Sequence, residues 1–151
     1  AVLTADCVPL LIFDKKRKMI AAIHAGWRGA YKGIIDKVIK FMFNQSCRKE
    51  NMIVAIGPCI SIKNYEVKKK FKQKFIKKDK TNIKFFKNKK KKIYFDLLNY
   101  TKKQVKLNQI KNIDLINIDT FNKKNNFFSA RRSLRLNHND YGRNISIIMI
   151  N

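Results

Sequence analysis

The sequence has few cysteines and no long apolar run. Its three cysteines, Cys7, Cys47 and Cys59, form no CxxC pair and leave an odd count, which indicates free thiols in a reducing compartment. No apolar stretch reaches the ~18 residues that span a bilayer, and no charged start followed by an apolar segment marks a signal peptide. We therefore expect a cytoplasmic protein with no membrane partner.

Acidic residues are also scarce: 10 Asp and Glu stand against 35 Lys and Arg, which gives a formal net charge of +25. Such an excess is typical of proteins that bind polyanions, so a basic nucleic-acid-binding module is one hypothesis. However, Lys, Asn, Ile and Phe supply about half of the residues, and their codons are AT-rich. Since no nucleic-acid recognition motif accompanies the charge, we favour this compositional explanation over a nucleic-acid partner.

The chain is long enough for one domain with a hydrophobic core and too short for two. Apolar runs predict strands at residues 8–13, 19–23, 52–56, 114–118 and 144–150. Apolar spacings of three and four predict a helix over 30–43, and a second helix is expected over 94–106 with Asp96 as its N-cap. The lysine-rich stretch 68–92 is expected to form a helix and an extended surface segment. The pattern indicates an α+β fold in a single domain over residues 1–151.

The first two strands predict a hairpin that brings together a cysteine and a histidine. If the hairpin turns symmetrically through Asp14 to Arg17, Cys7 faces His24, with their Cβ atoms ~4.5 to 5.5 Å apart. The pair could ligate zinc, or act as nucleophile and base in a metal-independent cysteine amidohydrolase or deamidase. The third interpretation is structural: Cys7 is a small buried residue and His24 a core histidine.

The segment that follows His24 has the composition of an anion site. Gly26 and Gly29 bracket Trp27 and Arg28 where a strand gives way to a helix. The first N–H groups of a helix have no internal partner, so together with Arg28 they can bind an anion such as phosphate. Trp27 offers a flat apolar face that can stack on a base or line a pocket.

Six short motifs occur in a recognisable order: TADC (4–7), HAGWRG (24–29), IGPCI (56–60), YEV (65–67), FFSARR (127–132) and GR (142–143). Together they resemble the laccase-domain family of bacterial polyphenol-oxidase-like proteins, now regarded as purine nucleoside phosphorylases with adenosine deaminase activity. The resemblance covers residues 4–150, and TADC and HAGWRG at this spacing are its most specific part. It implies an α/β/β/α layered sandwich with mixed sheets.

The resemblance also implies a zinc site, in which Cys7 and His24 match two ligands. The third ligand of the family is a histidine in a QVHG-type motif upstream of TADC, and no residue here matches it, so we expect an N-terminal part beyond Ala1. Many relatives carry cysteines before FFSxRR, whereas residues 119–122 contain none. We therefore expect zinc as the metal, with copper and laccase-like oxidation as less favoured alternatives.

The activity that the resemblance implies is phosphorolysis of adenosine, inosine or methylthioadenosine to the free base and ribose 1-phosphate, together with deamination of adenosine. The partners are thus a purine nucleoside and inorganic phosphate. Arg28, Arg131 and Arg132 are expected to hold phosphate by bidentate hydrogen bonds, with Trp27 lining the pocket. Asp6, next to Cys7, is expected to carry a proton or to orient the site.

Overall fold

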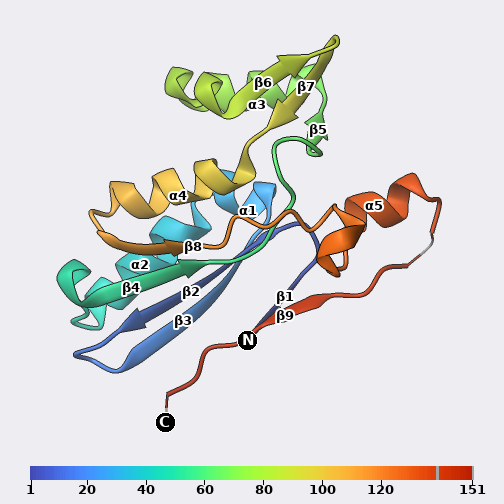
Figure 1. Cartoon of the computed structure of the whole chain (residues 1–151). Coiled ribbons are helices and arrows are strands. Elements are labelled where there is room, and N and C mark those ends of the chain that lie inside the picture. The colour runs from blue at the N-terminus through green and yellow to red at the C-terminus, as the bar shows by residue number, and fades with distance from the viewer. Residues whose placement is uncertain (139, 151) are drawn as a thin grey trace.

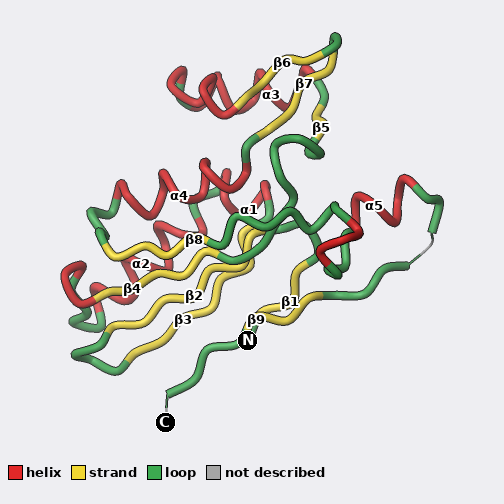
Figure 2. Tube along the Cα trace, viewed as in Figure 1, coloured by secondary structure: helices red, strands yellow, loops and turns green. Residues whose placement is uncertain are grey.

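A four-stranded sheet forms the centre of the protein (Figures 1 and 2). The computed structural model describes residues 1–138 and 140–150. The strand order is β3-β2-β4-β8, in which β2 runs antiparallel to β3 and β4, and β4 runs parallel to β8. The bounds are Val8–Asp14 for β2, Met19–Ala25 for β3, Met52–Ile56 for β4 and Asn112–Leu115 for β8.

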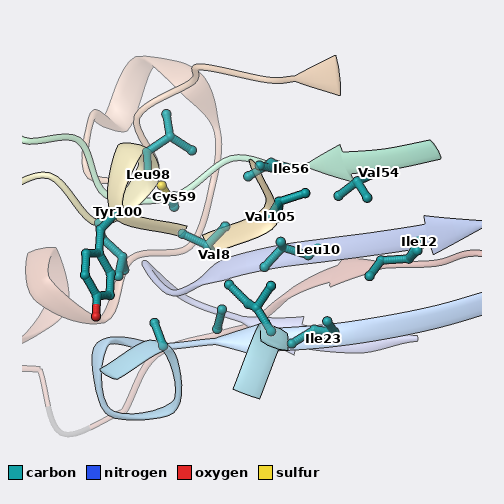
Figure 3. Packing of buried hydrophobic residues seen from close by; sticks show 14 of the residues in the cluster. Val8, Leu10, Ile12, Ile23, Val54, Ile56, Cys59, Leu98, Tyr100 and Val105 are labelled. Atoms are coloured by element: carbon teal, nitrogen blue, oxygen red, sulfur yellow. The ribbon is translucent and has the colours of Figure 1, made fainter. Parts of the chain in front are cut away.

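Helices cover one face of this sheet: α1 (Trp27–Tyr31), α2 (Ile34–Asn44) and α4 (Leu97–Leu107) (Figure 1). Alternate residues of β2 face them, and Leu10 and Ile12 are fully buried in the core that Figure 3 shows. The intervening residues point to the opposite face, where Phe13 is paired with Ile53, a residue 38% exposed. The core of the described chain therefore lies between the sheet and a single helical layer.

Two smaller sheets complete the fold. One joins β1 (Val2–Thr4) to β9 (Asn144–Ser146), so a strand near the N-terminus lies beside one near the C-terminus (Figure 1). The other has the order β5-β7-β6, with bounds Glu66–Val67, Lys92–Phe95 and Phe86–Lys89, and carries α3 (Lys69–Lys78). The last helix, α5, spans Ala130–Arg135. Among the described residues, no helix has both the length and the hydrophobicity that a bilayer span requires.

The predicted mixed α+β class is confirmed. The strand at 52–56 has the predicted bounds, and the carboxylate of Asp96 caps α4 by accepting a hydrogen bond from the Asn99 N–H at 2.9 Å. The helix predicted over 30–43 is confirmed from Ile34 onward as α2, but residues 30–33 do not belong to it, because the chain breaks at Gly33, whose φ of 80° is left-handed. The strand predicted at 114–118 lies two residues earlier, as β8 at Asn112–Leu115, and the strand predicted at 144–150 ends early, at Ser146.

The predicted hairpin register is also wrong, by two residues. Pro9, not Cys7, pairs with His24, and Asp14 pairs with Met19. The reason is that Asp14 belongs to the strand: its carboxylate accepts hydrogen bonds from the N–H groups of Lys16, Arg17 and Arg48 and so closes the loop that follows it. The turn thus lies one residue later than a symmetric count through Asp14 assumes.

An aromatic cluster joins α3 to the main core. Phe75 is fully buried, and its ring centroid lies 4.7 Å from that of Phe71, 4.8 Å from Phe95 and 5.1 Å from Tyr100. Because Tyr100 belongs to α4 and Phe95 to β7, this ring connects the lysine-rich segment to the rest of the protein. The helix expected in the lysine-rich stretch is present as α3, and its phenylalanines anchor it to the core.

Replacing Phe75 by Ala is expected to lower the free energy of unfolding by about 3–5 kcal/mol, because it removes a buried ring and leaves a cavity. Urea unfolding followed by circular dichroism measures the change. The matched control is Phe41→Ala, since Phe41 is 59% exposed on α2 and its loss should cost well under half as much. Equal costs for the two substitutions would contradict the anchoring role.

Candidate functional site

The structure brings Cys7 and His24 to the same place although they are not paired across the hairpin. Cys7 precedes β2, and His24 is the penultimate residue of β3. A Cβ atom built on Gly26 would lie 2.8 Å from Cys7 Sγ and 3.8 Å from His24 Nε2. The missing side chain of Gly26 therefore leaves the space on which the sulfur and the ring nitrogen converge.

The position of Cys7 depends on the residue before it. Asp6 has a φ of 78°, in the left-handed region that non-glycine residues rarely adopt, and is 8% exposed. Its carboxylate accepts hydrogen bonds from Thr120 Oγ1 at 2.8 Å and from the Arg131 N–H at 2.6 Å. Its carbonyl oxygen accepts a hydrogen bond from the Ile60 N–H at 3.1 Å. Both carboxylate oxygens are thus in use, which favours an orienting role over a proton carrier.

These contacts explain why the separate motifs occur together. Ile60 belongs to IGPCI, Arg131 to FFSARR and Asp6 to TADC, and the three meet at one loop. Thr120, which sequence reasoning did not assign to the site, supplies the other bond to Asp6. The only signal for Thr120 was its place shortly before FFSARR.

The environment of Cys7 keeps its thiol protonated. Burial, followed by the nearby Asp6 carboxylate, raises the pKa of Cys7 to about 11. A cysteine nucleophile needs the opposite shift, which a cation or a metal ion provides. The protein groups around Cys7 therefore do not by themselves produce a reactive thiolate.

Trp27 and Arg28 lie at the start of α1, directly after Gly26. The Arg28 side chain is exposed, and its guanidinium carbon lies 5.3 Å from the Trp27 ring centroid. The Trp27 ring also contacts Phe71 of α3, with centroids 4.9 Å apart. Trp27 thus links the start of α1 to α3 and lies against the Arg28 guanidinium.

The two arginines of FFSARR have different surroundings. The guanidinium of Arg132 donates hydrogen bonds to the carbonyl oxygens of Thr120, Phe121 and Phe127, so it holds loop backbone and is occupied. Arg131 uses Nη1 to donate to the Glu66 carbonyl oxygen at 2.8 Å. Its guanidinium also lies 5.1 Å over the ring of Tyr65 and lines a cavity. These contacts favour Arg131 over Arg132 as a ligand-binding group.

An open cavity of about 680 Å³ lies between α3 and α5, next to Trp27. Its walls are aromatic and cationic, and its lining includes Tyr65, Phe71 and Arg131. Tyr65 is buried, and burial, the largest influence, raises its pKa, whereas the Arg131 guanidinium lowers it. Trp27, which directly follows Gly26 in the chain, forms part of the cavity wall, and sequence reasoning did not detect the cavity.

The donor atoms present fit part of a zinc site. A thiol sulfur and an imidazole nitrogen are the ligands that zinc prefers, and they converge over the Cβ-sized space at Gly26. Across residues 1–138 and 140–150, no three or more His, Cys, Asp or Glu side chains form a group that could hold a metal ion. The remaining histidine, His138, is exposed near the end of α5, where its N–H donates to the Ser133 carbonyl oxygen.

The fold and the motifs agree with one family. The family described as multi-copper polyphenol oxidoreductase laccase matches residues 1–151, and the chain belongs to it. This confirms the resemblance inferred from TADC and HAGWRG.

Individual relatives are similar over most of this chain. A protein of Rickettsia prowazekii (strain Madrid E) named purine nucleoside phosphorylase is 34% identical over 135 residues, which cover 88% of this chain and 55% of the relative. A protein of the same name from Rickettsia conorii is 35% identical over 147 residues, covering 96% and 60%. The chain thus spans a little over half the length of these relatives.

Solved structures have the same fold. The hypothetical protein YfiH of Bacillus licheniformis is 25% identical, with a TM-score of 0.81 over 93% of this chain and 53% of its own. Protein NMB0706 of Neisseria meningitidis is 29% identical, with a TM-score of 0.77 over 87% and 53%. The α+β arrangement described above is therefore the fold of these proteins.

The protonated state of Cys7 has a measurable consequence. In metal-free protein, the rate of Cys7 alkylation by iodoacetamide is expected to keep rising up to about pH 11, the raised pKa of this thiol. At pH 7.5 its thiolate fraction should be roughly 100-fold below that of an unperturbed cysteine, because each pKa unit is a factor of ten. Peptide mass spectrometry over a pH series measures the rate. A plateau reached by pH 8 would contradict this assignment and indicate an activated nucleophile.

Proposed function

We propose that the protein catalyses phosphorolysis of purine nucleosides at the Cys7 and His24 pair. The observation that carries the proposal is the convergence of Cys7 Sγ and His24 Nε2 over Gly26. The next residue, Trp27, contacts Arg28 and lines an aromatic cavity. The names of the Rickettsia relatives support the same reaction. Because this chain spans a little over half of those relatives, the proposal concerns the full-length protein that contains these residues.

In this reaction a phosphate oxygen attacks the anomeric carbon of the ribose as the bond to the purine breaks. The transition state places a phosphate dianion beside a developing cation, and negative charge accumulates on the departing base. Arg28, two residues after Gly26, is exposed and can bind phosphate through two N–H groups. Arg131, held by the Glu66 carbonyl oxygen, supplies a second cation from the cavity side. Trp27 lines the same cavity as Arg131 and provides an apolar wall there.

Zinc is the metal that the donor atoms support best. Cys7 and His24 would hold it, with a further ligand from outside the described residues. Bound there, zinc supplies a Lewis acid for the departing base, and the deamination of adenosine would draw on the same acid. Asp6 orients Cys7 for this task, since Thr120 and the Arg131 N–H fix both of its carboxylate oxygens. Copper and polyphenol oxidation remain secondary proposals that rest on the family description.

The alternative of a metal-independent cysteine amidohydrolase has less support. Such an enzyme needs a thiolate at neutral pH, whereas burial and Asp6 raise the pKa of Cys7 to about 11. A bound metal ion removes this difficulty, because coordination deprotonates a thiol outright. The alkylation experiment described above distinguishes an activated cysteine nucleophile from a cysteine that needs a metal ion to lose its proton.

Substituting either member of the pair tests the function. In the full-length protein, Cys7→Ser and His24→Ala are each expected to lose bound zinc and to lower kcat/KM for inosine phosphorolysis by roughly 100-fold or more. Metal analysis and detection of hypoxanthine measure the two effects. The matched control is His138→Ala, which removes the other histidine of the chain, exposed near α5, and should change neither. Full turnover in Cys7→Ser would exclude the metal-centred mechanism.

Gly26→Ala tests the space between the two donors. Gly26 has a φ of −70°, which alanine adopts freely, so the backbone should tolerate the change. However, the new Cβ would lie 2.8 Å from Cys7 Sγ and force the sulfur to rotate away. We expect zinc affinity to fall at least tenfold with the fold intact. Gly29→Ala is the control, because its Cβ would lie no closer than 3.4 Å to Ile34, and it should retain zinc. Unchanged zinc affinity in Gly26→Ala would argue against the site.

A further inference from the structure

The cavity between α3 and α5 combines two kinds of wall. One is aromatic, formed by Trp27, Tyr65 and Phe71. The other is cationic, and its members come from the loop before α3, from α3 itself and from α5: Lys68, Lys70, Lys74, Arg131 and Arg135. At about 680 Å³ the cavity has the size of a small-molecule site. It is therefore shaped for a ligand that is both planar and anionic.

Several of the cations are held in place rather than left to move in solvent. The Lys74 ammonium lies 4.8 Å from the ring centroid of Tyr31 and 5.6 Å from that of Trp27. Arg131 is fixed by its bond to the Glu66 carbonyl oxygen and by the ring of Tyr65. Cations held against aromatic faces lose less freedom when an anion binds them. Other lysines, such as Lys78 and Lys84, also lie over aromatic rings, but Lys74 and Arg131 do so in the wall of one cavity.

The one acidic residue in the wall offsets only part of this charge. The Glu66 carboxylate pairs with Lys92 at 2.9 Å, outside the wall, and with one of the wall cations, Arg135, at 3.8 Å. Within the described part of the chain, Lys68, Lys70 and Lys74 have no carboxylate within 4.0 Å. The cavity therefore carries a positive potential that an anion of charge −2 can offset.

We propose that this cavity binds a free nucleoside 5′-monophosphate. The purine or pyrimidine ring stacks against the aromatic wall, and the phosphate is bound by Lys70, Lys74 and Arg131. Inorganic phosphate would use only the cations, and a nucleoside only the rings, so the nucleotide alone uses both. The cations converge on one cavity of single-nucleotide size instead of forming a track, which favours a free nucleotide over a nucleic-acid strand. The cavity shares Trp27 and Arg131 with the proposed phosphorolysis site, but nucleotide binding is measured without turnover, so the two proposals can fail separately.

The wall contains the only tryptophan of the chain, so its fluorescence reports on the cavity directly. We expect adenosine 5′-monophosphate to quench Trp27 emission, excited at 295 nm, with a Kd at least about tenfold lower than those of adenosine and inorganic phosphate at fixed ionic strength. A hexathymidylate tested at equal nucleotide concentration should bind more weakly than the monophosphate. Equal affinity for adenosine, or tighter binding of the hexathymidylate, would overturn the proposal.

A matched pair of charge variants separates the cavity from the general positive field. Lys70→Gln with Lys74→Gln should weaken binding of adenosine 5′-monophosphate by about tenfold or more. Lys77→Gln with Lys87→Gln removes the same charge from α3 and β6 outside the cavity and should leave the Kd within about twofold. Isothermal titration calorimetry gives both values without reliance on fluorescence. An equal loss in both pairs would assign the binding to net charge and overturn the cavity site.

Discussion

The arrangement of Cys7 and His24 depends on the carboxylate of Asp6. This side chain holds Thr120 and the start of α5, which lie 114 and 125 residues away in the sequence, against the segment before β2. The same residue adopts a left-handed backbone conformation, which turns the chain so that Cys7 Sγ reaches the space above Gly26. Backbone strain of this kind persists only where surrounding bonds over-determine it. The two side-chain bonds and the bond from Ile60 to its carbonyl oxygen supply that constraint.

Much of the fold could be predicted, because local patterns determine it. The strand at 52–56 and the Asp96 cap follow from an apolar run and a capping residue, which act within a few positions. The proximity of Cys7 and His24 was also predicted, but from a register that is wrong. The hairpin closes later because Asp14 bonds three N–H groups, and the left-handed turn at Asp6 restores the proximity that the register alone would have lost.

The parts that could not be predicted rest on contacts between distant segments. Arg131 and Arg132 cannot be distinguished from the sequence. In the structure, Arg131 lines the cavity, whereas Arg132 donates hydrogen bonds to three carbonyl oxygens of neighbouring loops. The role of α3 was equally hidden, since Lys74 looks like any other lysine until it is found over Trp27 and Tyr31. Composition describes how many cations the chain has, whereas packing decides which of them are fixed in one place.

The scarcity of glycine has a thermodynamic consequence of its own. The chain has five glycines, yet in the described residues only Gly33 has a positive φ, while eight other residues adopt one. Among them Lys90 and Lys91 form the tip of the β6–β7 hairpin, with φ of 47° and 59°. A lysine in that conformation costs about 1 kcal/mol relative to glycine. A codon bias that places lysine at turns therefore lowers the free energy of unfolding slightly at each such turn. Burial of the aromatic and apolar core must offset this loss.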